Sequence, residues 1–239
     1  MEYIHNTEQF QFHNTVVALG KFDGMHKGHQ LIFDELIQYK QLGYQAAVFS
    51  FDRPPLNMLK HKHMRVIYTT NEKIKLLARR GIDIYIEHPF TDEFSHLSPE
   101  DFVIKVLLEK TGMKVLVVGD DCGFGYKRQG NVELLERMSK EYDFKLIVIP
   151  KLELEGEIVS STRIRHLLSE GKVEEANRLM EDPFMICGPV VHGNHMGAEV
   201  LQMPTANQIP LEDKLLPPNG VYVSRIHYKD ETYYGISND

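Results

Sequence analysis

Cysteine is scarce in this 239-residue chain, tryptophan is absent, and no apolar run is long enough to cross a membrane. Two cysteines, Cys122 and Cys187, are too few for a disulfide framework and are typical of the reducing cytoplasm. The first residues, MEYIHNTEQF, lack the basic flank and apolar core of a signal peptide. Basic residues (27) are fewer than acidic ones (34), so the net charge of −7 argues against broad nucleic-acid binding. We therefore expect a cytoplasmic protein without a membrane or nucleic-acid partner.

Apolar strand-like runs alternate with helical patterns over most of the chain. This alternation predicts an α/β fold with a parallel sheet covered by helices on both faces, preceded by a short strand and turn in residues 1–14. Strands are predicted at residues 16–19, 46–51, 82–86, 114–118 and 144–149. Helices are predicted at 26–42, 69–81 (capped by Thr70 or Asn71), 98–112 and 131–142, with further helical structure after the run 160–165 that ends near residue 180. Ligands bind beyond the carboxyl ends of such strands, which places the loops 20–29, 52–61, 119–130 and 156–165 on one rim.

The most informative stretch is residues 16–30, VVALGKFDGMHKGHQ. A buried strand leads through two glycines, which permit tight turns, into a helix whose first turn is expected to carry His26, Lys27 and His29. The free amides and positive end of a helix attract phosphate, and residues three apart lie on the same side of it. Solvated surface histidines are the alternative. A zinc pair is disfavoured because zinc sites have three or four ligands.

His26-x-Gly28-His29 after a strand resembles the signature of the nucleotidyltransferase superfamily, which has a Rossmann-like fold. The longer string from Gly20 to Gln30 resembles the prokaryotic FAD synthetase family, whose members join an N-terminal FMN adenylyltransferase to a C-terminal riboflavin kinase. The resemblance implies that ATP is bound by Gly20, Phe22, Asp23, Gly24, His26, Gly28 and His29.

A second motif is the run from Ser160 to Arg165, SSTRIR, at the start of a predicted helix. Ser161 or Thr162 could serve only as an N-cap. The run resembles the Ser-Ser-Thr-x-x-Arg signature of the superfamily, which contacts the triphosphate. By that resemblance Ser161, Thr162 and Arg165 bind ATP, and a guanidinium suits phosphate because its planar donors hold two oxygens at once.

A third rim loop, residues 119–125, resembles the family pattern Gly-x-Asn/Asp-Phe-x-Phe-Gly. Asp121 and Phe124 match it, whereas Cys122 replaces an aromatic residue. The resemblance places Asp121 and Phe124 at the FMN, with Asp121 near a Mg²⁺ ion or the attacking phosphate. Phe102 lies in a stretch that also resembles the family, and it is expected to border the flavin, with core packing as the alternative. Lys127 and Arg128 either face phosphate or are solvated.

A domain boundary is predicted after Asp182. Residues 1–182 would form the nucleotidyltransferase domain, and residues 183–239 would form a shortened module that resembles riboflavin kinase, a partial β-barrel. Residues 198–203 replace the glycine-rich flap of that family, and the family's segment with the catalytic glutamate is not reached. Riboflavin kinase activity is therefore expected to be absent, and exposed strand edges allow an oligomer through this module.

Together these motifs predict an FMN adenylyltransferase that converts ATP and FMN to FAD and pyrophosphate with Mg²⁺. The catalytic residues would be His26, His29, Ser161, Thr162 and Arg165. Three alternatives remain open. They are a related transferase acting on nicotinamide mononucleotide, phosphopantetheine or a polyol phosphate, the full bifunctional enzyme, and a non-catalytic flavin or nucleotide sensor.

Overall fold

The first part of the chain forms one parallel six-stranded sheet, seen in a computed structural model that describes residues 1–52, 65–191 and 206–238. The strand order is β1-β4-β3-β2-β5-β6, and every neighbouring pair is parallel. The strands are β1 (Glu2–His5), β2 (Thr15–Leu19), β3 (Gln45–Phe51), β4 (Ile84–His88), β5 (Met113–Gly119) and β6 (Lys145–Ile149). The order reverses between β2 and β5, so a Rossmann-like ligand crevice is expected at their carboxyl ends.

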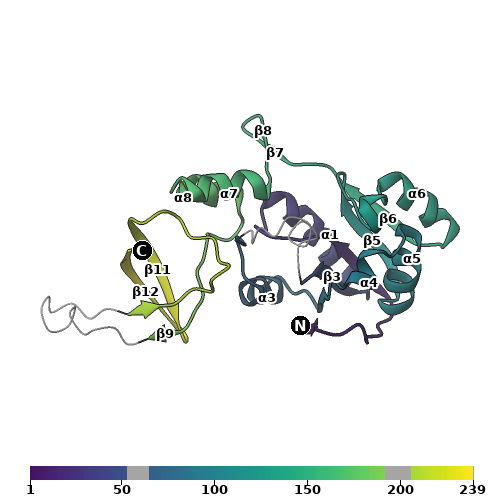
Figure 1. Ribbon diagram of the computed structural model, residues 1–239, viewed down its shortest axis with the longest axis horizontal. Coiled ribbons are helices and arrows are strands. Elements are labelled where there is room, and N and C mark those ends of the chain that lie inside the picture. The colour runs from purple at the N-terminus through teal and green to yellow at the C-terminus, as the bar shows by residue number, and fades with distance from the viewer. Residues whose placement is uncertain (53–64, 192–205, 239) are drawn as a thin grey trace, which may run out of the picture.

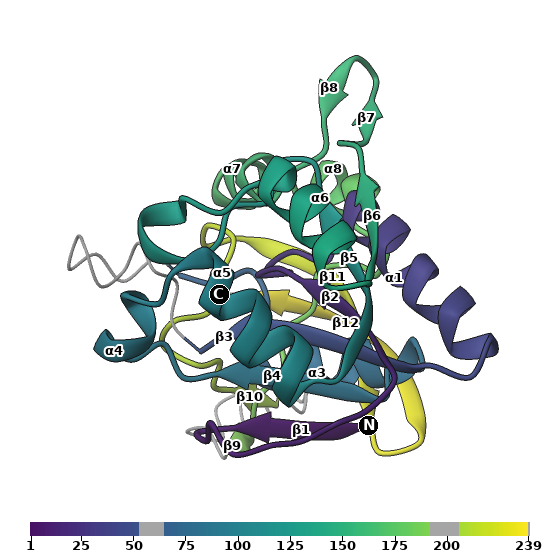
Figure 2. The ribbon, with the colours of Figure 1, turned by 90° about the vertical axis from the view of Figure 1, so that its right-hand side faces the viewer.

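Helices cover both faces of the sheet, as the sequence predicts. Alternate residues of each strand point to opposite faces, so Val16 and Ala18 join one core while Val17 and Leu19 join the other. The first face carries α1 (Lys27–Gln41), α3 (Thr70–Arg79), α7 (Ser161–Ser169) and α8 (Val173–Leu179). The second carries α4 (Asp92–Ser95), α5 (Pro99–Asp101), the π-helix η1 (Phe102–Lys110) and α6 (Val132–Glu141), of which α5 and α6 lie in front of the strands in Figure 2.

Some local predictions need correction. The cap of α3 is Thr69, not Thr70 or Asn71, because its hydroxyl accepts from the Glu72 amide while Glu72 accepts from the Thr69 amide. β4 begins two residues later than predicted, since the Ile82 amide is used to close α3 by donating to the Leu77 carbonyl. The predicted helix at 98–112 is largely a π-helix, which hydrophobic spacing does not distinguish from an α-helix.

The C-terminal part contains small antiparallel sheets, in agreement with its predicted β texture. β9 (Val190–Val191) pairs with β10 (Asn207–Gln208), and β11 (Val221–Tyr228) pairs with β12 (Glu231–Asn238). Figure 1 shows β9, β11 and β12 at one end of the long axis and the six-stranded sheet at the other. A hairpin of β7 (Glu153–Leu154) and β8 (Glu157–Ile158), which was not predicted, projects from the first part.

Candidate active site

The loop that leads from β2 into α1 ends in a histidine N-cap. α1 begins at Lys27, so His26 precedes the helix instead of lying in its first turn as predicted. The Nδ1 atom of His26 accepts a hydrogen bond from the His29 amide at 3.3 Å. Because Nδ1 is an acceptor, the neutral imidazole carries its proton on Nε2. That N–H is the donor that His26 can offer to a phosphate oxygen.

The two imidazoles are stacked, with ring centroids 3.6 Å apart and planes inclined by 19°. Burial lowers the pKa of His26 to about 4, and the nearby charge of Asp121 opposes this shift. Burial, and then the neighbouring His26, lower the pKa of His29 well below its ordinary value. Both rings are therefore neutral near pH 7, and they act as polar groups instead of cations. With His26 only 8% exposed, the alternative of solvated surface histidines does not describe this pair.

The Phe22 ring supports the histidine pair from within the core. It is 2% exposed and packs edge-on against His29, with 5.1 Å between ring centroids, and against Phe33 at 5.0 Å. The backbone of Phe22 has a φ of 49° and that of Met25 a φ of 39°, values that cost conformational energy in residues with side chains. Such strain is concentrated at functional loops. The resemblance implied a contact of Phe22 with ATP, but its ring lies beneath the loop.

The glycines of the loop lie where a side chain would crowd neighbouring groups. A Cβ atom at Gly28 would lie 3.2 Å from Nδ1 of His26, and one at Gly24 would lie 3.6 Å from the Ser161 hydroxyl oxygen. A Cβ at Gly20 would come within 2.9 Å of the Phe22 ring. The position of Ser161 beside Gly24 also shows that the two motifs, far apart in sequence, lie close together.

An ion pair joins the two motifs directly. One guanidinium nitrogen of Arg165 on α7 donates to the Asp23 carboxylate, and the other donates to the backbone carbonyl of Arg65. The second carboxylate oxygen of Asp23 accepts from the Ile67 amide at 2.9 Å. Asp23 was predicted to bind ATP. In the structure it holds the arginine in place beside the loop.

The start of α7 leaves two hydroxyls free of capping. Ser160 is the N-cap, and its hydroxyl accepts from the Arg163 amide at 3.2 Å. Ser161 and Thr162 therefore lie inside the first turn, and the interpretation of either as a mere N-cap is wrong. Their position at a helix N-terminus suits hydrogen bonding to an anion, and Ser161 also lies next to Gly24.

Further cations surround the loop, and one of them, Lys21, was not predicted as a site residue. The pKa of the Lys21 ammonium is lowered, first by burial and then by the nearby charges of Arg128 and Arg165, while Asp23 opposes the shift. Lys21 lies inside the first motif, which was the available signal for it. Arg128, for which two interpretations were open, thus lies close enough to act on Lys21. A bound polyanion would relieve the repulsion among these three cations.

Asp121 and the two phenylalanines predicted to contact FMN have different surroundings. Asp121 is exposed and pairs with Lys151, with 3.2 Å between Oδ2 and Nζ. The rings of Phe102 and Phe124 are 2% and 5% exposed, and their centroids are 5.8 Å apart within the core on the second face of the sheet. Phe102 therefore packs in the core, and its contact with the flavin stays a prediction. Burial raises the pKa of the Cys122 thiol to about 11, so this side chain is a neutral thiol near pH 7.

The described residues contain no cluster of three or more histidine, cysteine, aspartate or glutamate side chains that could hold a metal ion. In nucleotide enzymes Mg²⁺ is commonly held by one or two carboxylates together with the substrate phosphates, and water completes its shell. Asp121, exposed near His26, fits such a single protein ligand.

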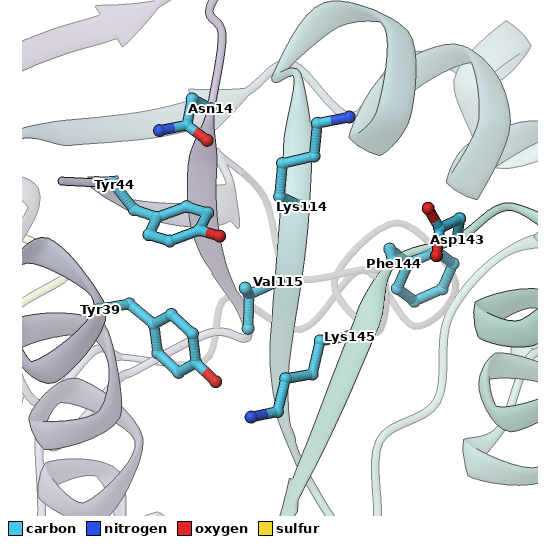
Figure 3. Close-up of a pocket in the computed structure, with 8 residues that line it drawn as sticks. All are labelled: Asn14, Tyr39, Tyr44, Lys114, Val115, Asp143, Phe144 and Lys145. Atoms are coloured by element: carbon cyan, nitrogen blue, oxygen red, sulfur yellow. The ribbon is translucent and has the colours of Figure 1, made fainter. Parts of the chain in front are cut away.

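A hollow in the described surface lies away from the two motifs. It encloses about 520 Å³ and is lined by Asn14, Tyr39, Tyr44, Lys114, Val115, Asp143, Phe144 and Lys145 (Figure 3). Lys114 and Lys145 stand at the amino ends of β5 and β6, so the hollow faces the rim opposite to the candidate site. It contains no residue of the two motifs.

Residues 8–163 match the family described as FAD synthetase. The chain belongs to this family. Residues 180–238 match the family described as riboflavin kinase. A relative from Buchnera aphidicola subsp. Schizaphis graminum, named bifunctional riboflavin kinase/FMN adenylyltransferase, is 38% identical over 98% of this chain and 76% of its own length. A Listeria monocytogenes relative of the same name is 35% identical over 99% of this chain and 76% of its own.

A solved structure from Streptococcus pneumoniae, described as a macrolide-efflux protein, superposes with a TM-score of 0.86 at 30% identity. It covers 99% of this chain and 77% of the other. Within the described ranges, no helix is long and apolar enough to span a membrane. The match of residues 180–238 to riboflavin kinase supports the resemblance noted for this module, but it does not support the expectation that kinase activity is absent.

Proposed function

We propose that this member of the FAD synthetase family transfers AMP from ATP to FMN, giving FAD and pyrophosphate. The observation that carries the proposal is the junction of the two motifs, in which Asp23 pairs with Arg165 and Gly24 lies next to Ser161 beside the stacked histidines. Two halves of a phosphate-binding site, about 140 residues apart in sequence, are thereby assembled at the rim where parallel sheets bind ligands.

In the proposed reaction an oxygen of the FMN phosphate attacks the α-phosphorus of ATP. The new P–O bond forms as the bond to the bridging oxygen of the β-phosphate breaks, and pyrophosphate leaves with that electron pair. A phosphate monoester has a second pKa of about 6, so the nucleophile is already a dianion and no general base is needed. Catalysis then consists of positioning and charge neutralisation.

Each residue has a defined part in this proposal. Arg165 and Lys21 neutralise charge on the phosphates, His26 and His29 hydrogen-bond the α-phosphate and the leaving pyrophosphate, and Ser161 and Thr162 donate to the triphosphate. Asp23 keeps Arg165 in place. Mg²⁺, carried in with the triphosphate and contacted by Asp121, would supply further charge neutralisation.

The acceptor is tested by incubating the protein with Mg-ATP and FMN and separating the flavins by chromatography. We expect FAD and one pyrophosphate per FAD. Parallel reactions offer nicotinamide mononucleotide, phosphopantetheine or a polyol phosphate, and faster turnover of any of these would refute the flavin assignment. A His29→Ala variant tests the sensor alternative: an enzyme loses turnover, whereas in a sensor the wild type has none to lose.

Riboflavin kinase activity is a second candidate function. It is favoured by the match of residues 180–238 and by the names of the bifunctional relatives. Riboflavin with Mg-ATP in a parallel tube decides it, because FMN is formed only if the module is active.

We also propose a division near residue 182 and a cytoplasmic location, in keeping with Cys122 and Cys187, which are both free thiols.

A further inference from the structure

A short segment, residues 65–67, is held from two sides, and we call it the bridging segment. On one side its Arg65 carbonyl accepts from Arg165, and its Ile67 amide donates to Asp23 at 2.9 Å. On the other side both backbone groups of Val66 bond to the C-terminal chain, at 2.7 Å each, through the Asp213 carbonyl and the Leu215 amide. Alternate residues of an extended chain face opposite sides, so one segment serves both the site and the C-terminal module.

Lys214 completes the attachment of this segment. Its ammonium donates to the Ile67 carbonyl at 2.6 Å, to the Met185 carbonyl at 2.7 Å and to the Glu72 carboxylate at 2.7 Å. These three bonds use all three protons of the ammonium. The side chains of Lys214 and Glu72 are both 0% exposed, so each bond acts without competition from water.

Glu72 links the same cluster to α3 and to the C-terminal chain. Besides Lys214, its carboxylate accepts from the Thr69 amide at 2.8 Å and from the Cys187 amide at 2.7 Å. The ammonium of Lys214 also lies 4.4 Å from the centroid of the Phe184 ring. The buried charges are therefore fully hydrogen-bonded, the condition under which a buried ion pair is tolerated.

Stability alone does not account for such a pair. A buried ion pair is often no more stabilising than apolar side chains of the same volume, whereas its directional bonds define one geometry. Here that geometry is the position of Ile67, whose carbonyl is held by Lys214 and whose amide is held by Asp23. A displacement of this one residue would move the carboxylate that holds Arg165.

We propose that Lys214 is a positioning residue for the adenylyltransferase site, acting through Ile67 and Asp23 on Arg165. This inference rests on the proposed function. It means that a residue within the riboflavin-kinase-like region, residues 180–238, belongs structurally to the AMP-transfer site. Lys214 does not touch the substrate in this arrangement.

The test compares Lys214→Met with two other variants of the full chain. The double variant Lys214→Met/Glu72→Gln avoids leaving an unpaired buried carboxylate. The control is Lys73→Met on α3, the helix that also carries Glu72. This change breaks another largely buried ion pair, between Lys73 and Glu87 of β4, whose charged atoms are 3.2 Å apart and whose side chains are 12% and 9% exposed. We expect both Lys214 variants to weaken Mg-ATP binding and to lower kcat/KM for FAD formation at least tenfold. Lys73→Met should change either value by less than twofold.

A double-mutant cycle distinguishes positioning from a general structural role. If Lys214 acts through Arg165, Lys214→Met should have less than a twofold further effect in an Arg165→Lys background. Independent, multiplicative effects of the two substitutions would overturn the inference. So would Lys214 variants with wild-type ATP affinity, or failure of both Lys214 variants to fold, since the pair would then hold the fold and not the site.

The two proposals fail in different ways. A wild-type protein that binds Mg-ATP but leaves FMN unchanged refutes the acceptor, and the dissociation constants for ATP then decide the role of Lys214 by themselves. A wild-type protein that does not bind Mg-ATP refutes both proposals.

Discussion

At the scale of single residues, the candidate site combines neutral donors with held cations. His26 and His29 are neutral because they are buried, and Arg165 is held by a carboxylate before any ligand arrives. Preorganised donors of this kind contribute more to a transition state than mobile ones, since no reorganisation is needed when charge develops. The charge of the site is therefore concentrated on Arg165, Lys21 and Arg128.

The buried His26 predicts a loss of stability in acid. Its pKa is about 4 in the folded protein and about 6.5 in the unfolded chain, so the unfolded chain binds the proton first as the pH falls. The contribution is fully present above pH 6.5 and is lost toward pH 4, about 2 kcal/mol of it by pH 5. In urea unfolding at pH 7 and pH 5, His26→Asn, which keeps a capping acceptor, should show a smaller difference than the wild type. The same change at the exposed His13 should leave the difference as it is.

The guanidinium of Arg165 is expected to be needed for the rate of FAD formation. Lysine cannot reproduce its fork of donors, so Arg165→Lys should lower kcat for FAD formation about 10²–10³-fold, as for other transition-state donors. Arg163→Lys is the matched control, because Arg163 lies in the same helix and pairs with Glu157 at 2.9 Å instead of with Asp23. Equal losses from the two variants in steady-state kinetics would contradict the assignment.

At the scale of elements, each of the two helix N-termini at the site is capped by the residue that precedes the helix. His26 caps α1 and Ser160 caps α7, which leaves the first turns of both helices directed at the rim. The strained residues Phe22 and Met25 lie in the same loop, between β2 and α1. The site is thus built from the carboxyl end of a strand and the starts of two helices.

The two adjacent serines at the start of α7 should respond in opposite ways to substitution by alanine, one losing stability and the other losing activity. Ser160→Ala removes the cap and should cost about 1 kcal/mol in the free energy of unfolding while most FAD formation is kept. Ser161→Ala should change the unfolding free energy little and lower the rate of FAD formation at least tenfold. Chemical unfolding and steady-state kinetics on both variants check this, and a reversed pattern would assign the cap and the ligand contact the other way round.

At the scale of the whole molecule, the C-terminal region is attached to the part of the chain that forms the parallel sheet through a few specific contacts. Phe184, Met185 and Leu215 pack against the core of the first face, and Tyr68 donates to the Asp182 carbonyl at 3.2 Å. By contrast, the β11–β12 hairpin keeps one apolar side exposed, with Val223 90% and Tyr234 78% accessible. The region is therefore anchored near Lys214 and open near its hairpin.

This attachment predicts similar hydrogen-exchange rates for the backbone amides of Val66 and Leu215. The Val66 amide donates to Asp213 and the Leu215 amide donates to Val66, so both should be released in the same opening event and show similar protection. Amide exchange followed by NMR measures both. A Leu215 amide that exchanges orders of magnitude faster than that of Val66 would show that the C-terminal chain detaches on its own.

The parallel sheet was predictable, and the two motifs could be recognised, because both depend on local patterns. Short apolar runs such as 16–19 and 114–118 alternate with helical spacing, and the glycine and histidine spacing of the first motif is compact. Ser160 as the cap of α7 was less predictable, because three hydroxyl residues in a row satisfy the same capping rule. The packing role of Phe102 depends on neighbours from other elements, and so sequence left both interpretations open.

The sequence by itself determined which chemical groups the site contains and the order of the elements that carry them, because spacing and apolar periodicity are local properties of the chain. Only the tertiary structure decided how these groups are held. The pairing of Asp23 with Arg165, the neutrality of the stacked histidines and the attachment of the bridging segment to Lys214 all depend on burial and on contacts between residues far apart in the chain. No local pattern carries that information, since a carboxylate or an ammonium looks the same in a sequence whether it meets water, a substrate or a buried partner.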